Sequence, residues 1–334
     1  MFRNRKPLLA LLVSMALVLG ACGNESVSEE TTTTEAVTET TVAETTTTSA
    51  ATTTTVQSGY PVTVESGGVT TTVESPPTAI VSLSPTATEM LFAIGAGSKV
   101  VAVDEYSYYP EEAPVTDLSG FTPNLEAIVA YEPDLVVVGG DIDGIVASLE
   151  GVGIPTLVLP AATVIEDAYQ QIRILGEITG FVDDAESLAS AMQAEIEGLV
   201  AEAEIPAEPL TYYHELGSDG GGAFYSVTSS TFIGEVFAAF GLENIADPAD
   251  TDGFGYPVLS VEFIIEADPD LIFFTNCCGD TPETISARPG WDSISAVSSG
   301  SLYELDDDLA SRWGPRLVEF FRLVADALSS RGGG

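Results

Sequence analysis

The sequence has little positive charge and almost no histidine. Of its 334 residues, 10 are lysine or arginine and 51 are aspartate or glutamate, which gives a formal charge of −41 at pH 7. A chain this acidic is repelled by phosphate backbones and acidic lipid headgroups, so we expect no nucleic-acid partner and no membrane contact beyond a covalent anchor. The single histidine, His214, excludes metal sites built from several histidines and the HExxH metalloprotease motif.

Motifs for common enzymatic chemistries are also missing. The chain contains no GxSxG elbow, no Walker A loop and no GxGxxG fingerprint. His214 and Glu215 form the strongest acid–base pair in the sequence, but they end a predicted strand, which favours a polar role at a domain interface. We therefore expect a protein that is not an enzyme and that holds no cofactor and no metal of its own.

Cysteine is scarce, with three in the whole chain. Cys277 and Cys278 are adjacent and follow a predicted strand that ends near Thr275. Outside the cytoplasm they could form a vicinal disulfide or remain free thiols, and thiolate binding of a metal is a further alternative. Two thiols without a nearby histidine make a poor metal site, so we favour a redox-labile structural pair.

The first 21 residues have the pattern of an export signal. Three basic residues precede an apolar stretch from about Leu8 to Leu19, which is too short for a bilayer that requires roughly 20 apolar residues. Leu19 to Cys22 then resembles a bacterial lipobox, in which the signal is cut before a cysteine that carries lipid. We predict a lipoprotein signal peptide over residues 1–21 and lipidation of Cys22; an ordinary signal peptide with a chance cysteine is the alternative.

A low-complexity segment follows the leader. Residues 22–58 are mainly threonine and glutamate and contain no aromatic residue, leucine or isoleucine. Such a composition cannot form a hydrophobic core, so we predict a disordered tether. A domain on this tether could search the space above the outer face of the plasma membrane.

From Gly59 onward, short apolar runs alternate with helical periodicity, which predicts an α/β fold. For a first lobe over residues 59–160, the pattern predicts a hairpin at 60–64 and 69–73, strands at 80–83, 100–103, 135–138 and 156–159, and helices near 125–130 and 142–149. Ser84 and Pro85 are an N-cap and a first-turn proline and predict one more helix there. Residues 161–205 predict two helices broken at Gly180, of which the second, 182–203, is about 33 Å long.

The βα alternation resumes after Pro206 and predicts a second lobe over residues 206–330. Strands are expected at 210–213, 271–275 and 301–304, and helices at 232–240 and 315–328. Residues 124–138 and 260–274 repeat one pattern, a capping residue, a Glu, a helix, a Pro-Asp break and a buried strand. Two copies flanking a long helix predict two Rossmann-like lobes joined by that helix, with a ligand cleft between them.

The order of several short motifs resembles a known family. Residues 80–104 look like the opening of the substrate-binding proteins that deliver ferric siderophores, haem or cobalamin to ABC importers. The similarity continues through residues 106–110, 120–126, 175–180, 260–262, 289–291 and 311–316, and so covers nearly all of residues 60–328. The resemblance implies two α/β lobes joined by one long helix that allows only modest hinge motion.

The resemblance also implies which residues surround the ligand. The candidates are Tyr106, Phe121, Phe224, Tyr256, Arg312 and Trp313. Aromatic faces would supply contact area to a large planar or chelated ligand, and arginine would supply charge-assisted hydrogen bonds. Plain packing is the alternative for each ring taken alone. Arg316 is expected to pair with a carboxylate such as Glu319 on the last helix.

Two glutamates recur at the second helical position of the repeat, Glu126 and Glu262. By resemblance, one such glutamate per lobe pairs with arginines of an ABC permease. Stabilisation of each helix dipole, by roughly 0.3 to 1 kcal/mol, is the alternative explanation.

The sequence as a whole therefore predicts a monomeric, lipid-anchored binding protein that hands a metal chelate to an ABC import permease. A chelate-processing enzyme of the cell envelope and a non-transport scaffold lipoprotein are the alternatives on the same fold. The low histidine count disfavours bare-metal uptake. The sequence leaves open whether the chelate is a siderophore complex, cobalamin or haem.

Overall fold

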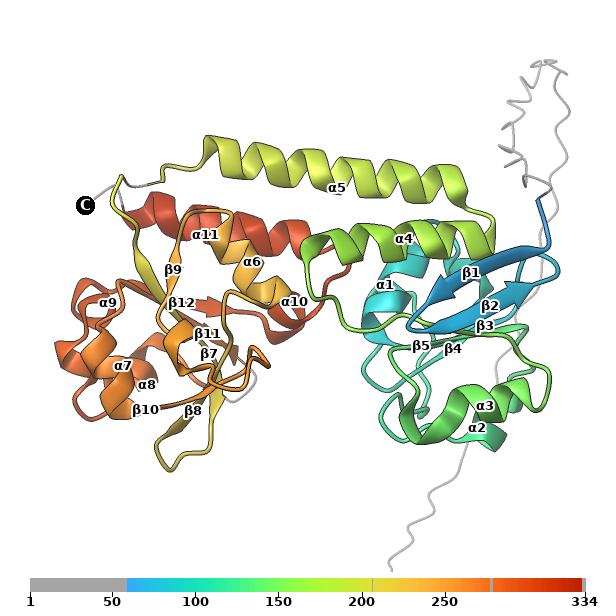
Figure 1. The fold of residues 1–334 in the computed structure, drawn as a ribbon, viewed down its shortest axis with the longest axis horizontal. Coiled ribbons are helices and arrows are strands. Elements are labelled where there is room, and N and C mark those ends of the chain that lie inside the picture. The colour runs from blue at the N-terminus through green and yellow to red at the C-terminus, as the bar shows by residue number, and fades with distance from the viewer. Residues whose placement is uncertain (1–58, 206, 277–278, 332–334) are drawn as a thin grey trace, which may run out of the picture. The chain divides into compact units, whose positions relative to one another are not determined.

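The computed structural model describes residues 59–205, 207–276 and 279–331 (Figure 1). The predicted signal peptide, the predicted tether with Cys22, and the adjacent Cys277 and Cys278 lie outside the described residues. In the described part, two separate sheets define two lobes, and a small two-stranded hairpin belongs to the first. The predicted two-lobe α/β fold is confirmed.

The first lobe is built on a parallel sheet with the order β4-β3-β5-β6. Its strands are β3 (Ile80–Leu83), β4 (Val100–Val103), β5 (Leu135–Val138) and β6 (Thr156–Val158), and the antiparallel hairpin is β1 (Val62–Ser66) with β2 (Val69–Val73). Its helices are α1 (Pro85–Ala93), α2 (Leu125–Val129) and α3 (Ile145–Glu150), with 3-10 turns at Gly97–Lys99 and Ile142–Gly144. All residues of β3 and β5 are buried, which explains the uninterrupted apolar run of β5 and the mainly apolar sequence of β3.

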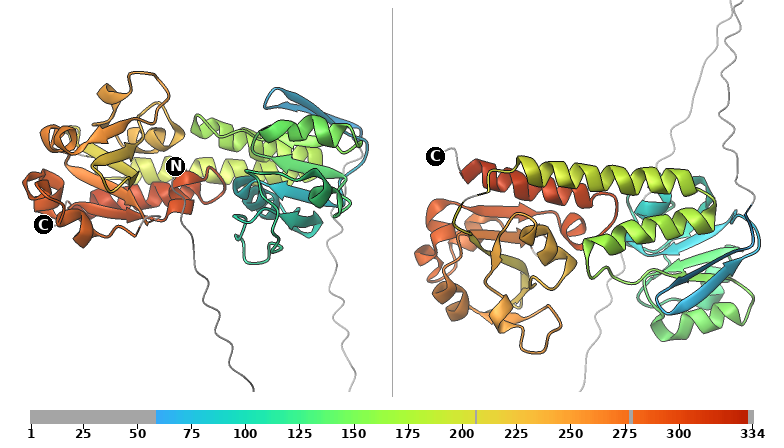
Figure 2. Two further views of the ribbon diagram at one scale, coloured as in Figure 1. Left: turned by 90° about the horizontal axis from the view of Figure 1, so that it is seen from below. Right: turned by 45° about the horizontal axis from the view of Figure 1, so that its top comes forward.

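Two helices follow the first sheet. These are α4 (Ile165–Thr179) and α5 (Val182–Glu202), and Gly180 ends α4 in the left-handed conformation at φ 84°. The two helices approach closely at Gly176, where a Cβ atom would lie 2.4 Å from the Cβ of Ala185. The long helix α5 packs on α4 and also on α11 (Leu317–Arg331), the last helix of the second lobe (Figures 1 and 2).

The second lobe has a mixed sheet with the order β10-β8-β7-β11-β12, and β9 pairs with β7. Its strands are β7 (Thr211–Ser218), β8 (Ala223–Ser226), β9 (Glu243–Asn244), β10 (Val258–Ser260), β11 (Leu271–Thr275) and β12 (Leu302–Leu305). Its helices are α6 (Phe232–Ala238), α7 (Val261–Ala267), α8 (Pro282–Ser286), α9 (Ser295–Ser299), α10 (Asp307–Ser311) and α11, with 3-10 turns at Asp247–Ala249 and Trp291–Ser293. Strands β7, β9, β11 and β12 run parallel, whereas β8 is antiparallel to both β7 and β10.

The predicted elements are confirmed with shifts of a few residues at their ends, but three strands of the second lobe were missed. Phe224, one of the expected ligand contacts, lies within the unpredicted strand β8. Strands β8, β9 and β10 have four, two and three residues, too few for an alternating pattern to emerge. The sheet of this lobe is consequently mixed and not purely parallel.

One apolar cluster joins the two lobes. It contains buried residues of the first sheet and α1, such as Ile80 and Met90, continues through α4 and α5, and reaches Phe237 on α6 and Phe320 on α11. Because these side chains form one contiguous cluster, the lobes share part of their core. None of the helices in the described ranges is both long and apolar enough to cross a membrane.

Candidate functional site

The first lobe presents exposed aromatic rings beyond the end of β4. Tyr106 is 48% exposed and Phe121 is 68% exposed, and their ring centroids lie 5.7 Å apart in an edge-to-face arrangement. Tyr108 is also exposed. The segment is anchored by buried Asp104, which accepts a hydrogen bond from the Ser107 hydroxyl. Burial is the main cause that raises the pKa of Asp104, and the hydrogen bond from Ser107 opposes it.

In the second lobe, Tyr256 is 53% exposed and lies in the loop before β10. Its neighbour Gly255 accepts a hydrogen bond from the Thr228 amide at 2.9 Å, so this loop lies against the start of α6. That helix faces the first lobe, because Glu235 accepts a 2.6 Å hydrogen bond from the Ile165 amide at the start of α4. Tyr256 therefore lies near the boundary between the lobes.

Arg312 connects the lobes at this boundary and is only 8% exposed. Its Nη1 donates to Glu89 Oε1 on α1 at 3.1 Å, and its Nη2 donates to the Tyr106 carbonyl at 3.2 Å and to Asp308 Oδ1 at 2.5 Å. Arg312 therefore lies at the lobe boundary, against the backbone of Tyr106. Most of its donors, however, are already used within the protein.

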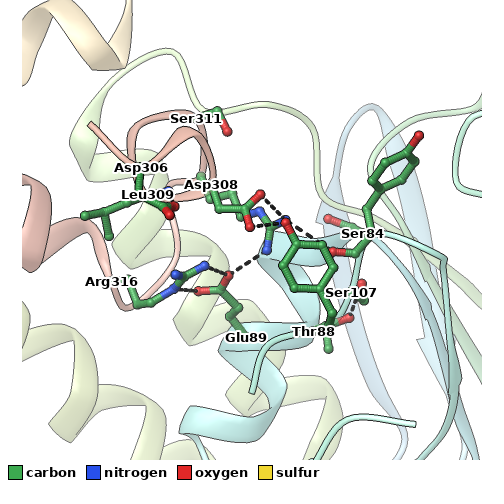
Figure 3. Close-up of polar contacts among 12 residues, drawn as sticks. Ser84, Thr88, Glu89, Ser107, Asp306, Asp308, Leu309, Ser311 and Arg316 are labelled. Carbon is green, nitrogen blue, oxygen red and sulfur yellow. Dashed lines mark hydrogen bonds and ion pairs between the residues drawn. The ribbon is translucent and has the colours of Figure 1, made fainter. Parts of the chain in front are cut away.

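Arg316 completes the connection (Figure 3). Its Nε and Nη2 donate to the two carboxylate oxygens of Glu89 at 2.9 and 2.6 Å. Glu89 is almost fully buried, and these hydrogen bonds are the main cause that raises the pKa of Arg316. The expected pairing of Arg316 with Glu319 is therefore wrong. The Arg316 guanidinium points across the lobe boundary to Glu89, because a buried carboxylate requires cationic partners. Glu319 on α11 is exposed and has no such requirement.

Two tyrosines lie over these arginines. The Tyr108 ring lies 5.2 Å from the Arg312 guanidinium carbon, and the Tyr109 ring lies 4.2 Å from that of Arg316. The Tyr108 hydroxyl also donates to Asp308, and burial together with that carboxylate raises the pKa of Tyr108. We refer to Glu89, Tyr108, Asp308, Arg312 and Arg316 as the inter-lobe network.

The sequence analysis did not predict a role for three members of the inter-lobe network: Glu89, Tyr108 and Asp308. Glu89 carries the only charge of helix α1, and a single carboxylate on a buried helix is a signal that could have been used. The run from Tyr106 to Tyr109, with three tyrosines in four residues, is a second usable signal.

A pocket of about 490 Å³ opens beside Glu89 and Arg316. Both lobes line it, with Phe92, Ala93, Tyr109, Pro110 and Glu112 from the first and Pro315, Arg316 and Glu319 from the second. A crevice between the lobes is thus present next to the inter-lobe network.

Trp313 lies where the lobes meet and is half-buried. Its indole N–H donates to Gln171 Oε1 on α4 at 2.8 Å, and its ring packs edge-to-face on Phe232 of α6 at 5.8 Å. Trp313 therefore contacts both lobes. Phe224, by contrast, is 7% exposed and packs in a separate core of the second lobe beside Trp291.

Known proteins with similar sequences and folds identify the family of this two-lobe protein. A sequence model described as periplasmic binding protein matches residues 80–309. The chain belongs to the periplasmic binding protein family. The uncharacterized ABC transporter substrate-binding lipoprotein YvrC of Bacillus subtilis is 29% identical over 257 residues, which cover 75% of this chain and 79% of YvrC. A cobalamin-binding protein of Halobacterium salinarum is 30% identical over 261 residues, which cover 74% of this chain and 68% of that protein.

Solved structures of binding proteins share the fold of this family member. The apo form of the periplasmic heme-binding protein RhuT from Roseiflexus sp. RS-1 has a TM-score of 0.67 at 25% identity and covers 76% of this chain and 98% of its own. The periplasmic vitamin B12-binding protein BtuF of Vibrio cholerae has a TM-score of 0.64 at 25% identity, with 78% and 99% covered. These relatives are binding proteins, and this chain too is a binding protein and not an enzyme.

His214 does not lie at a domain interface in this binding protein, contrary to our expectation. It is fully buried in β7, and its ring lies edge-to-face against Phe237 at 5.5 Å. Within the described residues neither of its ring nitrogens has a hydrogen-bond partner, and burial lowers its pKa to about 3. Its neighbour Glu215 is equally buried and accepts two hydrogen bonds from Arg288, at 2.6 and 2.7 Å. Apolar side chains therefore surround His214, whereas Glu215 belongs to a buried ion pair with Arg288.

The two repeat glutamates of this binding protein lie on exposed helix starts. Glu126 is the second residue of α2, which is capped by Asn124, and Glu262 is the second residue of α7, which is capped by Ser260. Both glutamate side chains are exposed. In the described ranges, no cluster of three or more His, Cys, Asp or Glu residues has a geometry that could hold a metal ion.

Proposed function

We propose that this protein is a lipid-anchored, extracytoplasmic solute-binding protein that captures a metal chelate of the ferric siderophore or cobalamin type. It delivers the chelate to an ABC import permease. The observation that carries the proposal is the set of exposed aromatic rings, Tyr106 with Phe121 in one lobe and Tyr256 in the other, in lobes that the inter-lobe network connects. The cargo named for the similar Halobacterium and Vibrio proteins, cobalamin or vitamin B12, supports the chelate class.

Single exposed rings are common on protein surfaces, but a group of them at a lobe boundary is typical of a ligand-binding surface. Three large aromatic side chains near a lobe boundary offer extensive apolar area at a low cost in side-chain entropy, and flat faces suit a corrin ring or the outer surface of a wrapped iron complex. The polar groups near the site are few, as is common in ligand pockets. In this proposal Arg312 contributes by holding Tyr106 and the second lobe in register, and Trp313 and Phe224 support the surfaces on which the ligand rests.

Docking on the permease is assigned to Glu126 and Glu262. Both carboxylates are exposed at the same helical position in their respective lobes, so two basic sites on a symmetric permease could engage them together. Neither glutamate belongs to the aromatic surfaces or to the inter-lobe network. The two contacts would place the ligand site over the transport path.

Attachment to the membrane is assigned to lipid on Cys22. The leader and the Thr/Glu-rich segment support this assignment, as does the description of the similar YvrC as a lipoprotein. In this proposal the protein works as a monomer on the outer face of the plasma membrane. The permease and the chelate are its partners.

Isothermal titration calorimetry tests the function. The purified protein is titrated with cyanocobalamin, haemin and several ferric siderophores, with the free metal ions as controls. We expect one chelate to bind with a Kd of about 1 μM or tighter and the free ions not to bind. If no chelate binds while a free metal ion does, the proposed function is wrong.

A further inference from the structure

We propose that the chelate carries no net negative charge. This inference rests on the function proposed above and specifies its ligand class. The arginines at the ligand site are already neutralised by carboxylates of the protein, so the site offers neutral aromatic surface and no free cation to an anionic ligand.

The inter-lobe network is the first part of the argument. Its two arginines, Arg312 and Arg316, contact two carboxylates, Glu89 and Asp308, so the charges sum to zero. Glu89 alone holds both guanidinium groups, and its side chain is 1% exposed. An anionic ligand that recruited either arginine would leave this buried carboxylate with one partner fewer, which is costly in a desolvated position.

Arg288, also in the second lobe, is likewise paired with carboxylates of the protein. It forms ion pairs with Glu215 at 2.6 Å and with Asp280 at 3.0 Å, so this group has a net charge of −1. Aromatic rings cover the guanidinium, with Phe224 at 5.1 Å and Trp291 at 4.5 Å. A pocket of about 380 Å³ adjoins it, but the cation on its wall is already compensated.

The remaining basic residues of the described ranges lie elsewhere. Arg173 pairs with Glu166 and Glu186, and Arg322 pairs with Glu195, all on the surface of the long helices. Lys99 precedes β4 and therefore lies at the opposite end of the sheet from the Tyr106 segment. Arg331 ends α11, about 21 Å along the helix axis from its first turn.

Acidic residues lie beside the exposed rings of the first lobe. Glu105 directly precedes Tyr106, is exposed, and accepts a hydrogen bond from the Ser119 hydroxyl at 3.0 Å. Asp306 is the N-cap of α10, and Asp307 and Asp308 are its first two residues. Burial is the main cause that raises the pKa of Asp307, and the charges of Asp308 and Asp306 raise it further. With a formal charge of −41 on the chain, the local field has the same sign as the overall field. This field raises the local concentration of cations and lowers that of anions.

The expected ligands follow from this charge distribution. A cationic or neutral ferric trihydroxamate, or a corrinoid, can cover the aromatic rings without uncompensated charge. A trianionic ferric tricatecholate, or a porphyrin with two carboxylates, would lose hydration and gain no cationic partner. We therefore expect discrimination by charge as well as by shape.

Calorimetric titration with five probes of graded charge tests the inference: ferrioxamine B (cationic), ferrichrome and cyanocobalamin (neutral), haemin and ferric enterobactin (anionic). The tightest ligand is expected to be neutral or cationic, with the anionic probes at least 100-fold weaker. If haemin or ferric enterobactin binds most tightly, the charge inference is wrong, while the proposed capture of a metal chelate stands. If none of the five binds, the proposed function fails instead.

Charge variants provide a second and independent readout. Asp308→Asn removes one carboxylate from Arg312, and Glu105→Gln removes one beside Tyr106. Each is expected to raise the affinity for the anionic probes relative to the tightest neutral or cationic one by at least threefold. Asp184→Asn, on the exposed face of α5, makes the same change in total charge far from the site and should leave that ratio unchanged. A ratio unaffected by both site variants would overturn the inference even if the panel gave the expected order.

Discussion

Glu89 and Arg316 belong to different lobes and are separated by 227 residues in sequence, yet they form a two-pronged ion pair with hydrogen bonds of 2.9 and 2.6 Å. Arg312 reaches the same carboxylate at 3.1 Å. One buried glutamate of α1 therefore holds two arginines from the segment before α11. This arrangement couples the stability of the protein to the relative placement of its lobes.

Removing that glutamate should strongly destabilise the protein. Glu89→Ala leaves two largely buried arginines without their shared partner, so we expect a loss of about 3 to 5 kcal/mol in the free energy of unfolding. Urea unfolding measures it. The control is Glu195→Ala, which breaks the exposed pair with Arg322 between α5 and α11 and should cost less than about 1 kcal/mol. Equal losses in the two variants would show that the inter-lobe network has no special role.

The exposed rings should determine affinity without determining stability. Replacing a central aromatic side chain of a binding site typically costs about 2 kcal/mol, so Tyr256→Ala and Phe121→Ala should each weaken chelate binding roughly thirtyfold. Because both side chains are more than half exposed, the unfolding midpoint should change little. Val152→Ala, an exposed apolar position in the loop that leads into β6, serves as the control. Unchanged affinity in both ring variants would place the binding site elsewhere.

Charge reversal at the two repeat glutamates should separate transport from binding. The Glu126→Arg and Glu262→Arg double variant should abolish chelate uptake by cells and leave the calorimetric affinity within about twofold, since neither side chain belongs to the aromatic surfaces. Glu150→Arg with Glu243→Arg is a matched double control, because both residues are exposed and lie one in each lobe. Glu150 ends α3, and Glu243 begins β9. Normal uptake by the first double variant would leave the helix dipole as sufficient explanation for both glutamates.

His214 should make the protein sensitive to acid. Burial lowers its pKa from 6.5 to about 3, so below pH 6.5 the unfolded chain binds a proton that the folded protein does not. The stability from this group is complete above pH 6.5 and decreases toward pH 3, by about 1.4 kcal/mol per pH unit. His214→Leu should flatten the dependence of the unfolding free energy on pH between 6 and 4. Phe237→Leu, which alters a ring that contacts His214, is the control and should lower stability equally at every pH. If the unfolding free energy of wild type and of His214→Leu had the same dependence on pH, His214 would not be the source of the acid sensitivity.

Lipidation of Cys22 predicts a change in location. Cys22→Ala should release the protein from the membrane fraction, because the lipid on Cys22 is the proposed attachment. Cell fractionation and immunoblotting measure the distribution. Cys277→Ala is the control and should remain with membranes. A Cys22→Ala variant that sediments as the wild type does would rule out the lipobox assignment.

Local pattern was enough to predict most of the fold. Ser84 and Pro85 predicted the start of α1, Gly180 predicted the break between α4 and α5, and the helix–strand repeat predicted both lobes. Each of these features is a pattern in the sequence itself, so no tertiary contact is needed to find it. Strand β8 was missed because Gly220 to Gly222 precede it and it has no helical or alternating run of its own.

The partners of charged residues could not be predicted in the same way. Glu319 is one helical turn from Arg316 and was the natural partner in the sequence, but the partner in the structure is Glu89 on another lobe. His214 likewise gave no sign of full burial, since a histidine at a strand end is compatible with solvent. Ion pairs between the lobes depend on how the two lobes pack against each other. The periodicity of the sequence does not reveal which residues that packing brings together.

The placement of the two tryptophans gives the molecule an optical readout of its own. Trp291 is fully buried within the second lobe, whereas Trp313 is half-buried at the boundary and hydrogen-bonded to Gln171 of the first lobe. In a Trp291→Phe variant the remaining indole emission reports the boundary alone. Strongly coloured iron complexes and corrinoids would quench that emission by energy transfer, and a widening of the crevice would shift it to longer wavelength as water reaches the ring. Cargo arrival and lobe movement can therefore be followed separately, in real time and without an attached dye.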